Sequence, residues 1–187
     1  MSAILPNPAC VSMSTTEVAV LSGGIPMLDR NLKALFTALL GLMALFFVIN
    51  NFVNLEQAHG SLAYVLSLTD HTAYPKSFVP PLTPAMAWLP TIAVLLAECA
   101  TAAVCLLGAL RLWTARKDAA AFAEAKKTAK LGAGLAIFTW FGLFTVFGSA
   151  AYQMWQTEIG DGSASGAFTF TALAFFTLLH LGQPEAE

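Results

Sequence analysis

A single carboxylate, Glu98, lies in the middle of the otherwise apolar stretch LLAECATAAVCLL at residues 95–107. A charged side chain at the centre of a membrane-spanning helix costs about 2.5–3.5 kcal/mol on insertion scales, so such a residue is rarely accidental. No Lys, Arg or His lies at the same depth in the other apolar stretches. Because desolvation disfavours the charged form, we expect the neutral acid, donating one hydrogen bond.

Helical spacing places Glu98 on a small, polar stripe that should pack against other helices. The stripe consists of Thr91, Glu98, Thr101, Ala102, Cys105 and Ala109. A matching stripe is expected on a later stretch, from Gly134, Phe141, Gly142, Thr145, Ser149 and Tyr152. The hydrogen-bonding side chains expected at the depth of Glu98 are Thr139, Trp140, Thr145, and Thr171 or Thr177. The first interpretation is that Glu98 is a hydrogen-bonded acid that fixes the register of the helices. One alternative is that it takes part in a proton or solute path, and another is that it contacts a partner subunit or a bound lipid.

The histidines and cysteines do not form a recognisable cofactor site. A bis-histidine haem needs two facing imidazoles, whereas His59 and His71 lie in one polar segment and His180 is far away. Cys99 and Cys105 are about 9 Å apart along one helix, too far for a disulfide, and Cys10 stands alone. A metal site could gather from Glu56, His59, Asp70, His71, Glu158 and Asp161, but solvated loop residues are the favoured interpretation. We therefore expect no catalytic residue, no metal and no cofactor.

Amide side chains gather at the ends of two apolar stretches that should lie at the same depth. One group is Asn50, Asn51 and Asn54, and the other is Gln153, Trp155 and Gln156. Because amides both donate and accept hydrogen bonds, the groups could tie the adjoining loop to the helices. They could also line a shallow polar pocket, which is the less favoured alternative.

The composition of the chain is typical of a membrane protein. The chain of 187 residues is 57% hydrophobic and 11% charged, against roughly 25% charged in soluble domains. Four charge-poor windows approach the length of about 20 residues that a helix needs to cross a bilayer. We predict an all-α, four-helix transmembrane bundle with spans at residues 31–53, 86–112, 131–155 and 166–181.

Basic residues give the expected orientation. The segment 113–130 carries Arg116, Lys117, Lys126, Lys127 and Lys130, which we expect to contact lipid headgroups. The positive-inside rule places this segment and both termini on the cytoplasmic side of the membrane, with loops 54–85 and 156–165 on the opposite side.

The segments between the spans also carry predictions. SLAYVLSL at residues 61–68 has Leu62, Val65 and Leu66 at helical spacing and suits a short interfacial helix. The Ala-rich segment 113–130 should extend spans two and three into a helical hairpin. Residues 1–30 are assigned to an N-terminal tail, with Met27 as an alternative start, and residues 183–187 to a short C-terminal tail.

Three short motifs give the chain a family resemblance. They are the Asn50, Asn51 and Asn54 group, YVLSLTD with Val65, Leu66, Ser67 and Asp70, and MWQT at residues 154–157. In their order and spacing they resemble DUF2165, a family of bacterial small integral membrane proteins of unknown function, over about residues 30 to 182. The resemblance implies a four-helix protein of the bacterial inner membrane, so loops 54–85 and 156–165 are expected in the periplasm and the segment 113–130 and both termini in the cytoplasm. It supplies no activity. Ala151 stands where the family pattern has an acid, and the loop lacks an Asp-Tyr pair.

The function predicted first is a non-catalytic accessory or assembly subunit of a larger inner-membrane complex of respiratory or photosynthetic type. Its expected partners are the lipid bilayer and other membrane-protein subunits, and no nucleic acid is expected. One alternative is a small solute or proton-linked transporter or channel that uses Glu98. Another is a lipid- or quinone-binding membrane protein.

Overall fold

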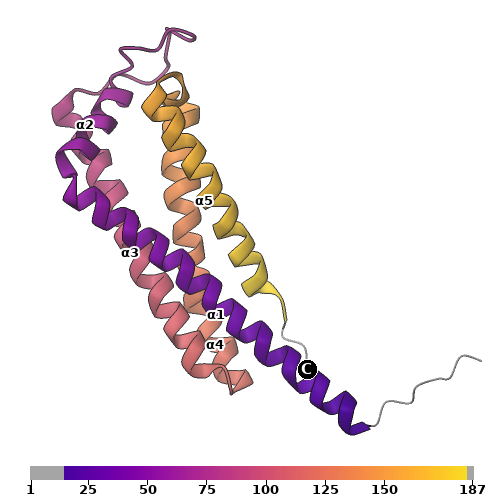
Figure 1. Cartoon of the computed structure of the whole chain (residues 1–187). Coiled ribbons are helices and arrows are strands. Elements are labelled where there is room, and N and C mark those ends of the chain that lie inside the picture. The colour runs from indigo at the N-terminus through magenta and orange to yellow at the C-terminus, as the bar shows by residue number, and fades with distance from the viewer. Residues whose placement is uncertain (1–14, 185–187) are drawn as a thin grey trace, which may run out of the picture.

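The structure, a computed structural model, describes residues 15–184, with side chains from Met27 onward, so Cys10 lies outside the described residues. All elements in this range are helical: α1 (Thr15–Val53), α2 (Leu55–Leu66), α3 (Pro84–Ala115), α4 (Ala119–Ile137), η1 (Phe138–Ala151), η2 (Met154–Gln156) and α5 (Glu158–Gly182). Helix η1 continues α4 directly, so four long helices result (Figure 1). The predicted all-α, four-helix fold is confirmed.

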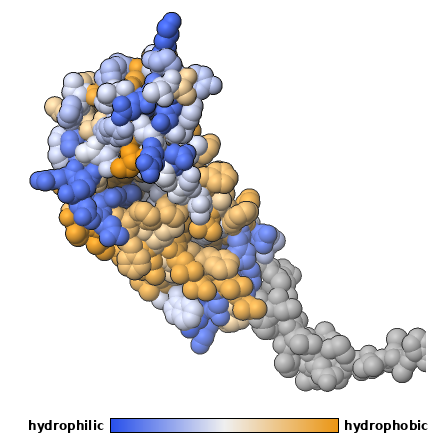
Figure 2. Space-filling model, turned by 45° about the horizontal axis from the view of Figure 1, so that its top comes forward, coloured by the Kyte–Doolittle hydropathy of each residue, from blue (hydrophilic) through white to orange (hydrophobic). Residues whose placement is uncertain are grey.

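Four helices are long and apolar enough to cross a membrane: Met27–Val53, Pro84–Ala115, Ala119–Ala151 and Glu158–Gly182. Apolar residues form a belt between hydrophilic ends on the face that Figure 2 shows. We call the end with α2 and residues 67–83 the loop end, and the end with the α3–α4 turn the basic end. The chain is therefore an integral membrane protein.

The helix bounds differ from the predicted spans. Residues 152–155 were assigned to span three, but the long helix ends at Ala151 and a short 3-10 turn begins at Met154. Gln153 has a left-handed φ of 52°, a conformation that cannot continue a right-handed helix. Helix α5 starts at Glu158, so most of the predicted 156–165 loop is helical. Residues 15–30 of the predicted tail belong to α1.

Small residues bring the helices together at the basic end. A Cβ on Gly108 would lie 2.8 Å from the Cα of Ala129, and one on Gly132 would lie 2.7 Å from the Sγ of Cys105. These glycines let α3 and α4 approach backbone to backbone, the usual way in which helices pack where no hydrophobic effect drives them together. The buried core continues along α1, α4 and α5 mostly as alanines.

Helix η1 has π-helical hydrogen bonding over 14 residues, an uncommon length for this conformation. The side chain of Thr145 donates to the carbonyl of Trp140, and the amide of Tyr152 donates to that of Phe147, each five residues back. The extra residue in each turn rotates the side chains out of phase with an α-helix. Phe141, predicted on the packing stripe, is 43% exposed, whereas Thr139 and Trp140 are buried. The prediction for Phe141 was wrong for this reason.

Candidate ligand-binding cleft

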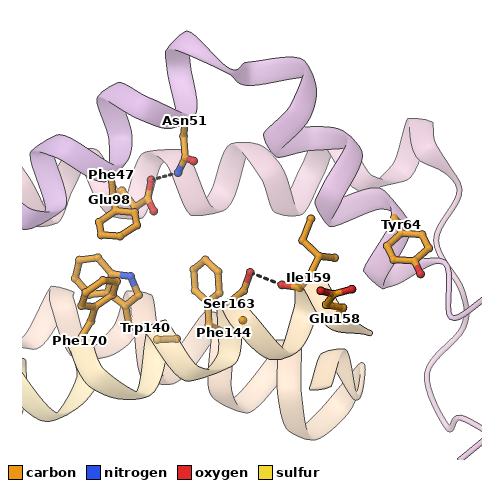
Figure 3. Close-up of a pocket in the computed structure, with 13 residues that line it drawn as sticks. Phe47, Asn51, Tyr64, Glu98, Trp140, Phe144, Glu158, Ile159, Ser163 and Phe170 are labelled. Carbon is orange, nitrogen blue, oxygen red and sulfur yellow. Dashed lines mark hydrogen bonds between the residues drawn. The ribbon is translucent and has the colours of Figure 1, made fainter. Parts of the chain in front are cut away.

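A cleft of about 890 Å³ separates α1 and α3 from η1 and α5 in the loop-end half of the bundle. The two helix pairs diverge toward the loop end in Figure 1, and Figure 3 shows their side chains facing each other across the cleft. Its size is typical of ligand sites in proteins. The lining residues are Phe47, Asn51, Tyr64, Glu98, Trp140, Phe144, Glu158, Ile159, Gly162, Ser163, Gly166, Ala167 and Phe170.

Glu98 lies within the apolar helix α3, and one side-chain hydrogen bond holds it among the described residues. Nδ2 of Asn51 donates to Oε2 of Glu98 over 2.8 Å, which joins α1 to α3 (Figure 3). The side chain of Glu98 is 1% exposed, and Oε1 has no hydrogen-bond partner among the described residues. The cleft therefore contains a carboxyl oxygen that is left over for a ligand.

Aromatic rings form the walls beside Glu98. The ring of Phe170 on α5 packs edge-on against Phe47 at 4.8 Å and against Trp140 at 5.3 Å. Phe144 lies one π-turn beyond Trp140 and lines the same space. Trp140 is 2% exposed, and in the part of the chain that the structure describes its indole N–H donates to no protein acceptor. The site thus combines an apolar surface with a few polar groups, as ligand sites usually do.

A second pocket of about 260 Å³ lies under α2 and shares Asn51, Phe144, Ile159 and Ser163 with the cleft. Its other residues include Leu62 and Val65 of α2. The shared lining shows that the two spaces adjoin each other. Helix α2 overlaps the helix predicted at residues 61–68, but it begins at Leu55 and ends at Leu66. It forms a roof over the loop end of the cleft.

The roof is held by contacts with α3 and with the loop before α5. The ring of His59 stacks on Trp88 at 3.9 Å, and Nδ1 of His59 lies 3.3 Å from the hydroxyl of Thr91. In the loop that follows α2, the backbone amide of Tyr74 donates to Oε1 of Gln156 over 2.9 Å, and the ring of Tyr74 packs against Trp155. Of the two predicted polar groups, Trp155 and Gln156 contact the loop, whereas the side chains of Asn51 and Asn54 bind Glu98 and the carbonyl of Asn50.

The predicted polar residues divide into groups that meet and groups that do not. The hydroxyl oxygens of Thr101 and Thr139 lie 3.1 Å apart and share a hydrogen bond, and Trp140 lines the cleft together with Glu98. Asn51 was predicted with the outer amide group, but its side chain donates a hydrogen bond to Glu98. The exposed Asn54 donates to the backbone of Asn50, and Gln156 donates to Gln153, so no hydrogen bond joins the two groups.

The residues predicted to contact lipid headgroups lie at the basic end. The guanidinium of Arg116 stacks over Trp113 at 3.9 Å, and Lys127 pairs with Glu124 at 2.7 Å. Lys126 reaches the carbonyl of Gln183 at 3.4 Å. Lys117 is exposed and Lys130 is half-buried.

An ion-pair cluster at the basic end was missed by the sequence analysis. The ammonium of the fully buried Lys33 lies 2.7 Å from Asp29 and 3.0 Å from the carbonyl of Gln183. Nε2 of His180 lies 3.6 Å from Asp29, so α1 and α5 are joined here. The spacing of Asp29 and Lys33, four residues apart on one helix face, was the available signal.

Two titratable groups in the loop-end segment are perturbed. Burial lowers the pKa of His71, and the nearby charge of Asp70 opposes this shift. The ring of His71 is buried, and neither nitrogen has a hydrogen-bond partner among the described residues. The hydrogen bond from Tyr64 to Asp70, at 2.6 Å, raises the pKa of Tyr64. Within residues 27–184, no three His, Cys, Asp or Glu side chains gather to hold a metal.

The comparisons with known proteins give one result. No curated protein and no solved structure matches the chain. The sequence pattern of a family described as predicted small integral membrane proteins, DUF2165, matches residues 29–184. This range includes every residue of the cleft and all of the four apolar helices except Met27 and Leu28 at the start of the first. The chain therefore belongs to the DUF2165 family of predicted small integral membrane proteins.

Proposed function

We propose that the protein is a non-catalytic membrane protein that binds an amphiphilic molecule, such as a lipid or a quinone, in the cleft under α2. The observation that carries the proposal is the position of Glu98, whose unpartnered Oε1 adjoins a space of about 890 Å³ lined by aromatic rings. Oε1 is not enclosed by protein and is accessible from the cleft, so the donor of a ligand can reach it.

The distribution of polar groups along the cleft matches a molecule with an apolar body. Phe47, Trp140 and Phe170 line the part beside Glu98, whereas Tyr64 and Glu158 line the part toward the loop end, with Phe144 and Ser163 between them (Figure 3). An apolar body would replace water against the rings. Its polar groups would reach Glu98 and Asn51 at one end, or Glu158 and Tyr64 at the other.

A glycine substitution tests the proposal by filling the cleft. Gly166 lines the cleft, and a Cβ there would meet no atom within 4 Å, so Gly166→Phe adds a ring without a backbone clash. Gly182 on the same helix is equally open but lies outside the cleft, so Gly182→Phe is the matched control.

We expect native mass spectrometry of the delipidated wild type, mixed with extracted phospholipid and quinone, to show one retained molecule per chain. Gly166→Phe should lose it, and Gly182→Phe should keep it. Equal retention by all three proteins would show surface lipid only and would refute the cleft as a binding site.

An accessory-subunit role is our second proposal, and one feature of the loop end supports it. The ring of Phe78 is 81% exposed in the segment between α2 and α3, beyond the apolar helices. Exposed aromatic rings are common at protein interfaces. If another subunit binds this segment, Phe78→Ala should reduce its recovery after purification in a mild detergent. Recovery of the wild type without any reproducible partner would contradict this role.

A further inference from the structure

We infer that the ligand of the cleft is a hydrophobic organic cation, whose charged nitrogen or phosphorus centre lies beside Glu98 among the aromatic rings. This inference rests on the proposed function and specifies the class of its ligand. Three features of the described residues support it: the charges that line the cleft, the rings beside them, and the charge of the loop end.

The lining of the cleft carries acids and no base. Glu98 and Glu158 line the large space, and none of the residues described around it or around the adjoining pocket is Lys, Arg or His. An anionic ligand would therefore bury its charge beside carboxyl groups without a counter-ion, which is strongly unfavourable. Desolvation favours the neutral acid at Glu98 when the cleft holds no cation, whereas the charge of a bound cation would favour the carboxylate, which would then be its counter-ion. Oε1 of Glu98 has no protein partner among the described residues and faces this space.

The rings add a second attraction for a cation. Phe47, Trp140, Phe144 and Phe170 all line the cleft, and Trp140 and Phe170 do so close to Glu98 (Figure 3). A cation near the face of an aromatic ring gains about 0.5–2 kcal/mol, most when it is desolvated. A large apolar cation is also only weakly hydrated, so it loses little on leaving water for this site.

The charge of the loop end favours the approach of a cation to the roofed side of the cleft. Glu56, Asp70, Glu158 and Asp161 lie in or beside this end, whereas Lys76 is the only Lys or Arg between residues 54 and 85. A surface with an excess of one charge raises the local concentration of ligands with the opposite charge. The basic end, where the arginines and most lysines lie, would have the opposite effect.

Two probes of nearly the same shape and opposite charge test the inference. Tetraphenylphosphonium and tetraphenylborate would be titrated by calorimetry into the purified full-length protein in a neutral detergent, with protein-free micelles as the blank. We expect saturable binding of tetraphenylphosphonium at one site and no saturable binding of tetraphenylborate.

Variants locate the site. Glu98→Gln keeps a side chain that can bond Asn51, so the fold should persist while tetraphenylphosphonium binding weakens about tenfold or more, which corresponds to about 1.4 kcal/mol. Gly166→Phe should abolish binding, because it occupies the cleft. Glu124→Gln removes an exposed acid of α4 at the basic end, far from the cleft, and should leave binding unchanged.

The outcomes separate the two proposals. Tighter binding of tetraphenylborate, or unchanged tetraphenylphosphonium binding in Glu98→Gln, would overturn the assignment of a cationic ligand. If a neutral amphiphile is retained by the wild type and lost from Gly166→Phe while tetraphenylphosphonium does not bind, the cleft function stands and the cation inference fails. If neither probe nor amphiphile binds, both proposals fail.

Discussion

At the scale of single residues, the Asn51–Glu98 pair decides how the cleft is built. The amide of Asn51 occupies one carboxyl oxygen and leaves the other open, so the same bond fixes α1 against α3 and orients the acid. The bond lies in the apolar part of the bundle, where water offers little competition. Its loss should therefore be measurable in the stability of the whole protein.

We predict that Asn51→Leu lowers the free energy of unfolding by about 0.6–1.7 kcal/mol, the range found for hydrogen bonds between membrane helices. Equilibrium unfolding in mixed micelles, followed by circular dichroism, would measure it. Asn50→Leu is the control, because Asn50 is an exposed neighbour on α1 whose side chain contributes no hydrogen bond. Equal stability of the two variants would contradict the role of the bond.

We predict that acid loosens the loop-end segment through His71. Because burial lowers the pKa of His71, the folded segment prefers the neutral ring. This stabilisation is complete above the unfolded value of about 6.5 and is lost as the pH falls through the lowered folded value. Hydrogen exchange of residues 67–83 should therefore accelerate between neutral pH and about pH 5, after correction for intrinsic rates. His71→Leu should remove the extra acceleration, and its persistence there would assign the effect to another group.

The burial of Glu98 could be predicted from sequence, but its partner could not. The stripe around Glu98 has small, polar residues at helical spacing, and the structure buries all six of its members. Asn51 was assigned to the outer surface because depth was counted as if every helix spanned the same distance. Helix α1 ends at Val53, as the predicted span does, but its last turn meets α3 at Glu98, while α3 continues past this level to its start at Pro84. Only the tertiary arrangement reveals this offset.

At the scale of elements, α3 and α4 depend on glycine for their close approach. Gly132 faces Cys105, with a hypothetical Cβ 2.9 Å from its backbone nitrogen. A contact with backbone cannot be relieved by rotating a side chain. The helices must move apart if this glycine is replaced.

We predict that Gly132→Ala destabilises the protein by about 1–3 kcal/mol, as overpacked cores usually do. Gly134→Ala is the matched control on the same helix, since a Cβ there meets nothing within 4 Å. It should be neutral or stabilising by about 0.5–1 kcal/mol, because alanine favours helix more than glycine does. Thermal unfolding of both variants in the same detergent would compare them, and a stabilised Gly132→Ala would contradict the close approach.

The four apolar helices were predictable because the lack of charge over a bilayer-spanning length is a strong signal. The helical hairpin of α3 and α4 also followed from composition, and Asp118 caps α4 by accepting from the amides of Ala120 and Ala121. The π-helical hydrogen bonding of η1 has no comparable signal in the sequence. The stripe predicted through Phe141 was therefore out of phase with the structure.

At the scale of the whole molecule, the charges indicate an orientation that remains a proposal. Arg30, Arg111, Arg116 and the lysines of α4 gather at the basic end, and the carbonyl of Arg116 accepts from Arg30. The loop end is acidic. We propose a bacterial inner-membrane protein with the basic end in the cytoplasm, as the positive-inside rule requires.

We predict that a membrane-impermeant maleimide labels Ala73→Cys in intact spheroplasts and labels Ala120→Cys only after lysis. Both positions are exposed, and they lie at opposite ends of the bundle. The background would carry Cys10→Ser, while Cys99 and Cys105 lie within the apolar span. Labelling of Ala120→Cys in intact spheroplasts would reverse the proposed orientation.

The restriction of the cleft to the loop-end half has a mechanical consequence for the surrounding bilayer. A change in the width of the cleft alters the area that the protein occupies in one leaflet and leaves the area in the other almost unchanged. The lateral pressure of that single leaflet therefore acts on the separation of the two helix pairs. Lipids that crowd the headgroup region would favour a narrow cleft, and lipids that relieve this crowding would favour an open one.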